Sequence, residues 1–313
     1  MNFLKRLKQK RKPLTSEAVA FSYTDKEILK DVTLNLKESE LVSIIGKSGC
    51  GKSTFLKLVA GIISKKHAGK IKIFGHNKIF SKSKLGFVPQ EFAFIPDLSI
   101  EDNIKIFGLN LGLSETKSLE KARELMTLLK LNEDIHKKPT QLSGGQKVRL
   151  NILLSFLHDP QILILDEPFV GLDFLNRRLL WHFLETMKKK KKSIILTSHL
   201  LTETQEHVDK LIILKDGKIF FKGNLENLKS KLKTHYILEL RFSYLSKENY
   251  EKIKKYCNYH DIKIMDAYEK YIMLGINKEA QRNMITKTFD KLNLKYKEIS
   301  YREPNLDEVF LSA

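Results

Sequence analysis

Residues 46–54, GKSGCGKST, fit the pattern G-x-x-x-x-G-K-[ST] and lie between the apolar run 41–45 and a helical pattern over 54–61. Glycines lack a Cβ, so the backbone N–H groups of such a loop can turn onto an anion. The N-terminus of the following helix adds a partial positive charge. The stretch predicts a phosphate-binding loop, and the alternative interpretation is a glycine-rich turn with incidental lysines.

Two side chains of this loop have the chemistry to act on a nucleotide. Lys52 supplies a positive charge to the β- and γ-phosphates, and the Ser53 hydroxyl is a ligand for Mg²⁺. The residues that we expect to contact the nucleotide in this loop are Gly46, Lys47, Ser48, Gly49, Cys50, Gly51, Lys52, Ser53 and Thr54.

Two adjacent acids end a second apolar run, residues 162–165. A magnesium site beside a nucleotide needs a carboxylate, and the end of a buried strand is its usual source. Asp166 is therefore predicted to bind the metal through water, and Glu167 to polarise the attacking water. The alternative is that the two acids only mark an ordinary strand-to-loop transition. The presence of a phosphate loop in the same chain argues against this alternative.

His199 follows the apolar run 194–197, at the strand end where ligands of open α/β sheets bind. Its position makes it the candidate for sensing the γ-phosphate. The alternative is an exposed histidine with no functional role, which is the usual case for a lone histidine. Gln90, in the segment 87–91, is neutral and is a candidate for completing the shell of Mg²⁺ or of the water.

A second glycine motif, LSGGQ at 142–146, opens another helical pattern. Its candidate anion-binding residues are Ser143, Gly144, Gly145 and Gln146, again at a helix N-terminus. A second phosphate-binding surface is unexpected in a chain with one phosphate loop. A glycine turn between two helices is the alternative interpretation.

The 313 residues are enough for two domains with full-size cores. The composition, 42% hydrophobic and 30% charged, is that of a globular protein. No apolar stretch approaches the roughly 18 residues of a transmembrane helix, and the N-terminus lacks the apolar region of a secretory signal. The two cysteines, Cys50 and Cys257, suggest no disulfide framework, so we expect a cytosolic chain.

The formal charge of +19 indicates an anionic partner, such as nucleic acid, a membrane surface or a nucleotide. Part of the excess is local, in the N-terminal arm 1–15 and in the lysine run 188–192. Solvated, exposed faces are the alternative reading of such runs.

The elements that must position these residues follow from the apolar periodicity. Short strands over 16–41 indicate an antiparallel sheet, and the apolar runs at 162–165, 194–197 and 211–214 indicate buried parallel strands. Helical periodicity dominates 99–159. The pattern predicts an α/β parallel-sheet core over 16–225, with a helical subdomain at about 91–160.

A change in pattern at 224–233 separates a second domain, 234–313. We predict strands over 236–242, 262–265, 271–274 and 295–301, and helices over 247–259 and 278–292. The order βαββαβ is the ferredoxin-like α+β arrangement.

The motifs GKSGCGKST, FVPQ, LSGGQ, ILILDEP, GLD (171–173) and TSH (197–199), in this order, resemble those of an ATP-binding-cassette (ABC) ATPase, in particular the nucleotide-binding subunit of an ABC transporter. The resemblance covers roughly residues 17–225. It implies a P-loop cassette that binds ATP and Mg²⁺, with 46–54 as the Walker A loop.

The resemblance also assigns roles to single residues. It implies that Asp166 is the Walker B aspartate, Glu167 the catalytic base, Gln90 the Q-loop residue and His199 the switch histidine. The signature is 142–146 and the D-loop is 171–173, ending in Asp173. Tyr23 falls where the family places an aromatic that stacks on adenine, and a core or surface tyrosine is the rival reading.

In this family the signature of one subunit covers the ATP bound to the Walker A loop of another. The resemblance thus implies a dimer around two ATP molecules, a homodimer because Glu167 and His199 are both present, with a heterodimer as the alternative. Residues 303–311 are similar to the ending of ATPase subunits of ABC-2-type exporters, which pair with a separately encoded permease.

We therefore expect a cytoplasmic subunit that is peripheral on the inner face of the membrane and drives export. The basic arm is either an interfacial helix on anionic lipid, with Phe3, Leu4 and Leu7 on one face, or a disordered arm. The rival function is a soluble ABC ATPase that acts on nucleic acid or the ribosome. One phosphate loop, one signature and no room for a coiled coil between them argue against it.

Overall fold

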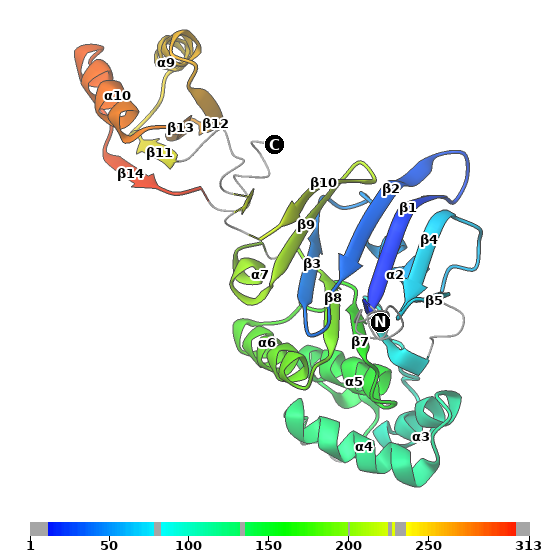
Figure 1. Cartoon of the computed structure of the whole chain (residues 1–313). Coiled ribbons are helices and arrows are strands. Elements are labelled where there is room, and N and C mark those ends of the chain that lie inside the picture. The colour runs from blue at the N-terminus through cyan, green and yellow to red at the C-terminus, as the bar shows by residue number, and fades with distance from the viewer. Residues whose placement is uncertain are drawn as a thin grey trace. The chain divides into compact units, whose positions relative to one another are not determined.

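The computed structural model describes residues 12–77, 83–131, 135–199, 201–224, 227–228 and 236–304. The chain divides into two compact units, residues 1–223 and 224–313 (Figure 1). The predicted arm up to residue 11, the segment 229–235 and the exporter-like ending from 305 onward lie outside the described residues.

A six-stranded sheet forms the centre of the first unit, in the order β10-β9-β3-β8-β7-β6. Its strands are β3 (Leu41–Ile45), β6 (Leu85–Val88), β7 (Ile162–Leu165), β8 (Ser193–Thr197), β9 (Lys210–Lys215) and β10 (Lys218–Gly223). All neighbours are parallel except β10, which runs antiparallel to β9. The predicted parallel-sheet core is therefore confirmed.

The apolar strands are buried on both faces, as their unbroken apolar runs predict. Successive side chains of β7 alternate between two hydrophobic clusters: Leu163 and Leu165 belong to one, Ile162 and Ile164 to the other. Because both faces are covered by apolar side chains, the polar residues of these segments gather where the strands end.

A second, antiparallel sheet covers part of the core, in the order β2-β1-β4-β5. Its strands are β1 (Leu14–Ser22), β2 (Glu27–Leu36), β4 (Ala68–Ile73) and β5 (His76–Asn77). β1 begins inside the predicted arm 1–15, because Leu14 is fully buried and pairs with Leu36 and Ile73.

Helices complete the first unit (Figure 1). Among the described residues they include α2 (Lys52–Val59), α3 (Ile100–Asn110), α4 (Glu115–Leu128), the short 3₁₀ helix η2 (Pro139–Gln141), α5 (Gly144–Phe156), α6 (Phe174–Lys189) and α7 (Leu201–His207). α3, α4 and α5 pack on one another within the predicted helical subdomain, and Ser99 caps α3 by accepting the N–H of Asp102. Within the described part of the chain, no helix is long and apolar enough to span a bilayer.

Over residues 236–304 the second unit is a four-stranded antiparallel sheet with two helices. Its elements are β11 (Tyr236–Arg241), α9 (Lys247–Tyr259), β12 (Lys263–Tyr268), β13 (Tyr271–Ile276), α10 (Glu279–Lys291) and β14 (Glu298–Arg302). The sheet order is β12-β13-β11-β14. The predicted sequence of elements, strand–helix–strand–strand–helix–strand, is the one observed.

Candidate functional site

The loop 46–54 passes from the end of β3 into α2 with no room for larger side chains at two glycines. A Cβ on Gly46 would lie 2.3 Å from the backbone oxygen of Leu214. Gly51 has φ of 107°, and a Cβ there would lie 2.7 Å from the side chain of Leu29. Gly51 is also the N-cap of α2, so the helix starts at Lys52, two residues earlier than predicted. Lys52 and Ser53 thus occupy its first turn.

Lys52 is buried and folds back over its own loop. Its Nζ donates to the backbone oxygen of Gly46 at 2.8 Å and to that of Lys47 at 3.4 Å. The same Nζ lies 3.6 Å from Oε1 of Glu167. The ammonium group therefore stands between the phosphate loop and the carboxylate after β7.

Asp166 is the centre of a hydroxyl network that joins three segments of the sheet edge. Its Oδ1 accepts hydrogen bonds from Ser53 Oγ and from Thr197 Oγ1, each at 2.8 Å. Thr197 Oγ1 in turn accepts the backbone N–H of Glu167 at 2.8 Å. The predicted neighbours Ser53 and Asp166 are thus brought together. These oxygen donors are of the type that Mg²⁺ prefers, so the residues present fit that ion.

Thr197 was not among the residues that we predicted for the site. Its signal in the sequence is a hydroxyl at the end of the buried strand 193–197, where an apolar residue would otherwise stand. That signal is weak because Ser and Thr also occur in ordinary strands. The hydrogen bonds that give Thr197 its role join residues far apart in the chain.

Glu167 is 7% exposed and has φ of 52°, in the left-handed region that few non-glycine residues adopt. Its Oε1 lies 2.9 Å from Nε2 of His199 and 3.6 Å from Nζ of Lys52. Burial raises the pKa of Glu167, and the charges of His199 and Lys52 oppose that rise. The structure thus holds a carboxylate of raised proton affinity between the two residues predicted to contact phosphate.

Gln90 lies just beyond β6, whose last residue, Val88, pairs with Leu165 of β7. It is exposed and stands at the same sheet edge as Asp166. Asn151, which is buried, holds the chain on both sides of it: its Oδ1 accepts the N–H of Ala93 and its Nδ2 donates to the oxygen of Pro89. Sequence reasoning missed Asn151, a polar residue inside an otherwise apolar helix face.

The LSGGQ motif begins α5 with a complete capping box. Ser143 Oγ accepts the N–H of Gln146, and Gln146 Oε1 accepts the N–H of Ser143. Gly144 is open, with no atom within 4 Å of a Cβ placed on it, whereas a Cβ on Gly145 would lie 2.6 Å from the side chain of Asn176. The motif therefore packs on α6 through Gly145 and leaves Gly144 on the surface.

Asp173 ends the GLD segment and caps α6. It accepts the backbone N–H of Asn176 with Oδ1 and the Asn176 carboxamide N–H with Oδ2, both at 2.8 Å. These hydrogen bonds hold the pKa of the Asp173 carboxyl below its usual range. The carboxamide oxygen of Asn176 accepts from Arg149 of α5. Asn176 thus joins the GLD segment to the LSGGQ helix.

Tyr23 lies in the turn between β1 and β2, and about half of the residue is exposed, 49%. Its ring meets that of Phe21 edge to face, with centroids 4.9 Å apart. β2 also contacts the phosphate loop, since Leu29 limits the space at Gly51. The tyrosine ring is therefore on the surface rather than in the core.

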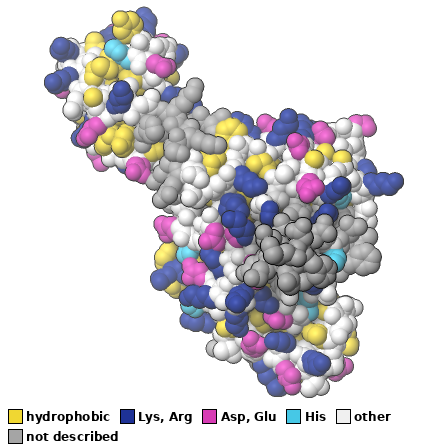
Figure 2. All heavy atoms as spheres, viewed as in Figure 1, with side chains coloured by type: hydrophobic (Ala, Val, Ile, Leu, Met, Phe, Trp, Pro, Cys, Tyr) yellow, Lys and Arg dark blue, Asp and Glu magenta, His cyan; other side chains and the backbone are white. Residues whose placement is uncertain are grey.

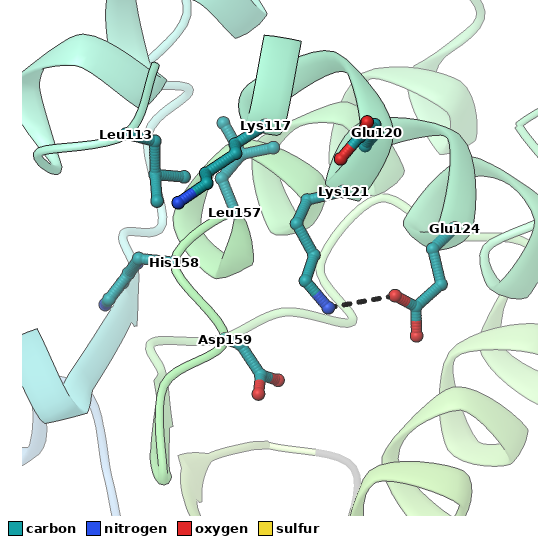
Figure 3. Close-up of a pocket in the computed structure, with 8 residues that line it drawn as sticks. All are labelled: Leu113, Lys117, Glu120, Lys121, Glu124, Leu157, His158 and Asp159. Carbon is teal, nitrogen blue, oxygen red and sulfur yellow. Dashed lines mark hydrogen bonds and ion pairs between the residues drawn. The ribbon is translucent and has the colours of Figure 1, made fainter. Parts of the chain in front are cut away.

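A cavity of about 360 Å³ lies between α4 and the loop that follows α5, outside this cluster (Figure 3). Figure 3 shows Lys121 and Glu124 of α4 paired above Asp159. None of the predicted site residues lines it; the lining residues are Leu113, Lys117, Glu120, Lys121, Glu124, Leu157, His158 and Asp159. The cluster of predicted site residues at the sheet edge is therefore separate from this cavity.

The lysine run 188–192 is partly neutralised by carboxylates. Lys188 pairs with Asp209 at 2.6 Å, Lys190 with Glu124 at 3.0 Å and Lys192 with Asp159 at 2.8 Å. Figure 2 likewise shows Lys and Arg side chains interspersed with Asp and Glu on the visible face of the first unit. This part of the charge excess supports the reading of a solvated face.

Comparison with known proteins agrees with this geometry. The family model described as ABC transporter matches residues 29–170. The chain is 29% identical to the linearmycin resistance ATP-binding protein LnrL of Bacillus subtilis (strain 168) over an alignment of 311 residues that covers 96% of this chain and 97% of that protein. It is 28% identical to the Nod factor export ATP-binding protein I of Rhizobium etli over 226 residues, 71% of each chain.

A solved structure described as the dimeric structure of MJ0796, a bacterial ABC transporter cassette, has a TM-score of 0.61 and 27% identity, and the match covers 68% of this chain and 98% of that one. The uncharacterized ABC transporter ATP-binding protein YxlF of Bacillus subtilis (strain 168) is 34% identical over 224 residues, 71% of this chain and 74% of that protein. The chain thus belongs to the ATP-binding subunits of ABC transporters, which hydrolyse ATP to drive transport.

Proposed function

We propose that the edge formed by loop 46–54, Asp166, Glu167 and His199 is the ATP hydrolysis site. The observation that carries this proposal is the position of the Glu167 carboxylate, buried between Lys52 and His199 at 3.6 and 2.9 Å. A carboxylate so placed can take a proton from water beside a bound γ-phosphate. Lys52 and the loop N–H groups hold the phosphates, and His199 contacts the γ-phosphate.

The proposal places Mg²⁺ on Ser53, Asp166 and Gln90. When bound, the ion neutralises charge on the β- and γ-phosphates. The network around Asp166 supports this assignment, because Ser53 and Thr197 orient its Oδ1 at 2.8 Å each. Tyr23 offers an exposed ring for stacking on adenine, an interaction worth roughly 1–3 kcal/mol per base in other proteins.

We also propose that two cassettes close around two ATP molecules. Ser143, Gly144, Gly145 and Gln146 of one subunit, with Asp173, would then complete the site of the other. The open surface at Gly144 supports this role, since nothing within 4 Å covers it. The dimeric MJ0796 cassette provides a precedent. A homodimer is expected because this chain carries both Glu167 and His199, and a heterodimer is the alternative.

The partner in the membrane is proposed to be a separately encoded permease, with the subunit on the inner face and export as the direction of transport. The name of the Nod factor export relative supports export. The basic arm 1–15 is proposed to touch anionic lipid beside that permease.

We assign the second unit the ferredoxin-like arrangement, which the strand order β12-β13-β11-β14 supports. We also assign it a regulatory or dimer-supporting role.

Replacing Glu167 with Gln tests the site and the dimer together. The variant should bind ATP, lose about 10²- to 10⁴-fold in kcat, and elute from a sizing column as a dimer with ATP but as a monomer with ADP. Glu120→Gln, an isosteric change at an exposed position of α4, is the matched control and should behave as the unchanged protein. A Glu167→Gln chain that stays monomeric at saturating ATP contradicts the dimer, and one that keeps full activity contradicts the site.

The permease and the rival function are separated by capture experiments. From detergent-solubilised membranes, the tagged chain should carry a polytopic membrane protein with it. Co-sedimentation with ribosomes or DNA that persists at high salt would instead favour the nucleic-acid reading, because simple electrostatic attraction weakens as salt rises.

A further inference from the structure

Helix α6 contacts α7, the helix after His199, through three side chains spaced four residues apart. Arg177 Nε donates to Glu203 at 2.8 Å from Oε1 and 3.1 Å from Oε2. Trp181 stacks on the imidazole of His207 with centroids 4.4 Å apart, and Glu185 Oε1 lies 2.8 Å from His207 Nδ1. Residues four apart share one face of a helix, so these contacts form a continuous seam.

The same face of α6 also holds the segment that follows Glu167. Arg177 Nη1 donates to the backbone oxygen of Leu172 at 2.9 Å. The indole of Trp181 stacks on Phe169 with centroids 4.4 Å apart. One arginine therefore bonds to the GLD segment with Nη1 and to α7 with Nε. A guanidinium can do this because its donors are fixed in a planar fork.

This arrangement matters because the His199 side chain is largely exposed. That side chain is 50% exposed, whereas its partner Glu167 is 6% exposed. His199 lies between β8, which ends at Thr197, and α7, which begins at Leu201. Its distance of 2.9 Å from Glu167 thus depends on where β8 and α7 place its backbone.

We propose that Arg177 is a positioning residue for ATP hydrolysis. Arg177 ties the GLD segment to α7, so that His199 lies against Glu167 only when the GLD segment is in place. This inference rests on the proposed function, because it gives His199 a role in the reaction. Since Asp173 of the same segment is proposed to meet the partner subunit, dimer closure would act on His199 of the same chain through Arg177.

The test is a double-mutant cycle on the full chain. Arg177→Met keeps the apolar stem and removes both donors, and it should lower kcat by about 10- to 100-fold, the cost of misplacing a reacting group, with the KM for ATP unchanged. In a His199→Ala background, followed under single-turnover conditions, the same substitution should have no further effect on the rate, because Arg177 acts through His199.

Arg178→Met is the matched control: Arg178 is the next residue, exposed, and its guanidinium lies over the Phe174 ring instead of reaching α7. It should leave kcat unchanged. Arg177→Lys distinguishes loss of positioning from misfolding. A lysine can reach one acceptor but not both, so kcat should still fall. ATP binding and the unfolding temperature should stay near those of the unchanged chain.

Equal losses from Arg177→Met in both backgrounds, a change in KM alone, or the same loss from Arg178→Met would overturn the proposal. These outcomes differ from failure of the proposed function, which would show as full activity in Glu167→Gln. An unchanged kcat in Arg177→Met with an inactive Glu167→Gln would remove the positioning role and leave the hydrolysis site standing.

Discussion

The carboxamide of Asn176 fills the space beside Gly145, 2.6 Å from where a Cβ on that glycine would lie. The same side chain bonds to Asp173 and accepts from Arg149. The second glycine of LSGGQ is therefore required by packing within the subunit. At Gly144, by contrast, a Cβ would meet no atom of another segment within 4 Å, so this glycine is free to approach another molecule.

Alanine at these two glycines should separate packing from assembly. Gly145→Ala is expected to lower the free energy of unfolding by about 1–3 kcal/mol, the usual cost of overpacking. Gly144→Ala adds its methyl to open space in a helix, so its free energy of unfolding should stay level or rise by up to about 1 kcal/mol. Urea denaturation of both variants measures the difference.

Dimerisation should be affected in the opposite way from stability. In the proposed dimer, the methyl group of Gly144→Ala stands where a phosphate of the ATP on the partner subunit would approach. ATP-dependent dimerisation should therefore weaken in this stable variant. Equal unfolding free energies for the two variants would show that the Asn176 contact does not limit position 145.

Thr197→Val should weaken both stability and catalysis. The substitution keeps the shape of the side chain but leaves the buried N–H of Glu167 without its acceptor, a loss of about 1–3 kcal/mol in the free energy of unfolding. It also removes one donor to Asp166, so kcat should fall. Thr197→Ser keeps the hydroxyl and is the control. If the Val and Ser variants match in urea denaturation and in kcat, the network around Asp166 has no such role.

The raised pKa of Glu167 predicts two effects of pH. A general base must be ionised, so kcat should decline as pH falls through the pKa of Glu167. Because that pKa is raised, the decline should begin at a higher pH than for a glutamate with the usual pKa of about 4.3. A carboxyl whose pKa is raised on folding favours the protonated form. Its contribution to stability is present below the unfolded pKa and is lost as pH rises through the folded pKa.

Glu167→Gln, which cannot ionise, should accordingly gain unfolding temperature over the unchanged chain at neutral pH, and the gain should shrink towards acidic pH. Thermal unfolding followed across pH gives both curves. A gain that grows as pH falls would have the wrong sign for a pKa raised by burial.

Cys50 should react slowly with alkylating reagents at neutral pH and faster as pH rises. It is buried in the phosphate loop, and burial raises the pKa of its thiol, with Lys52 opposing that rise. Labelling should block ATP binding, and ATP should protect the thiol.

Cys50→Ser provides the control, because burial raises the pKa of the remaining Cys257 to about 12. The folded variant should take up no label, as counted by mass spectrometry. Full ATPase activity after stoichiometric labelling of Cys50 would contradict its place beside the nucleotide.

The sequence by itself determined many of the elements and singled out most residues of the candidate site. Unbroken apolar runs required strands buried on both faces, and the end of such a strand is where Asp166, Glu167 and His199 emerge. Local spacing likewise predicted the phosphate loop, the helix that begins at LSGGQ and the βαββαβ order of the second unit.

Only the tertiary structure decided how these pieces contact one another. Thr197, Asn151 and Arg177 make hydrogen bonds to residues distant in the chain, and a hydroxyl, an amide or an arginine in a periodic pattern does not reveal its partner. The tertiary structure also decided that Gly144 is open and Gly145 closed, since both are glycine in the sequence. Spacing along the chain fixes which face of an element a residue occupies, but packing fixes what that face meets.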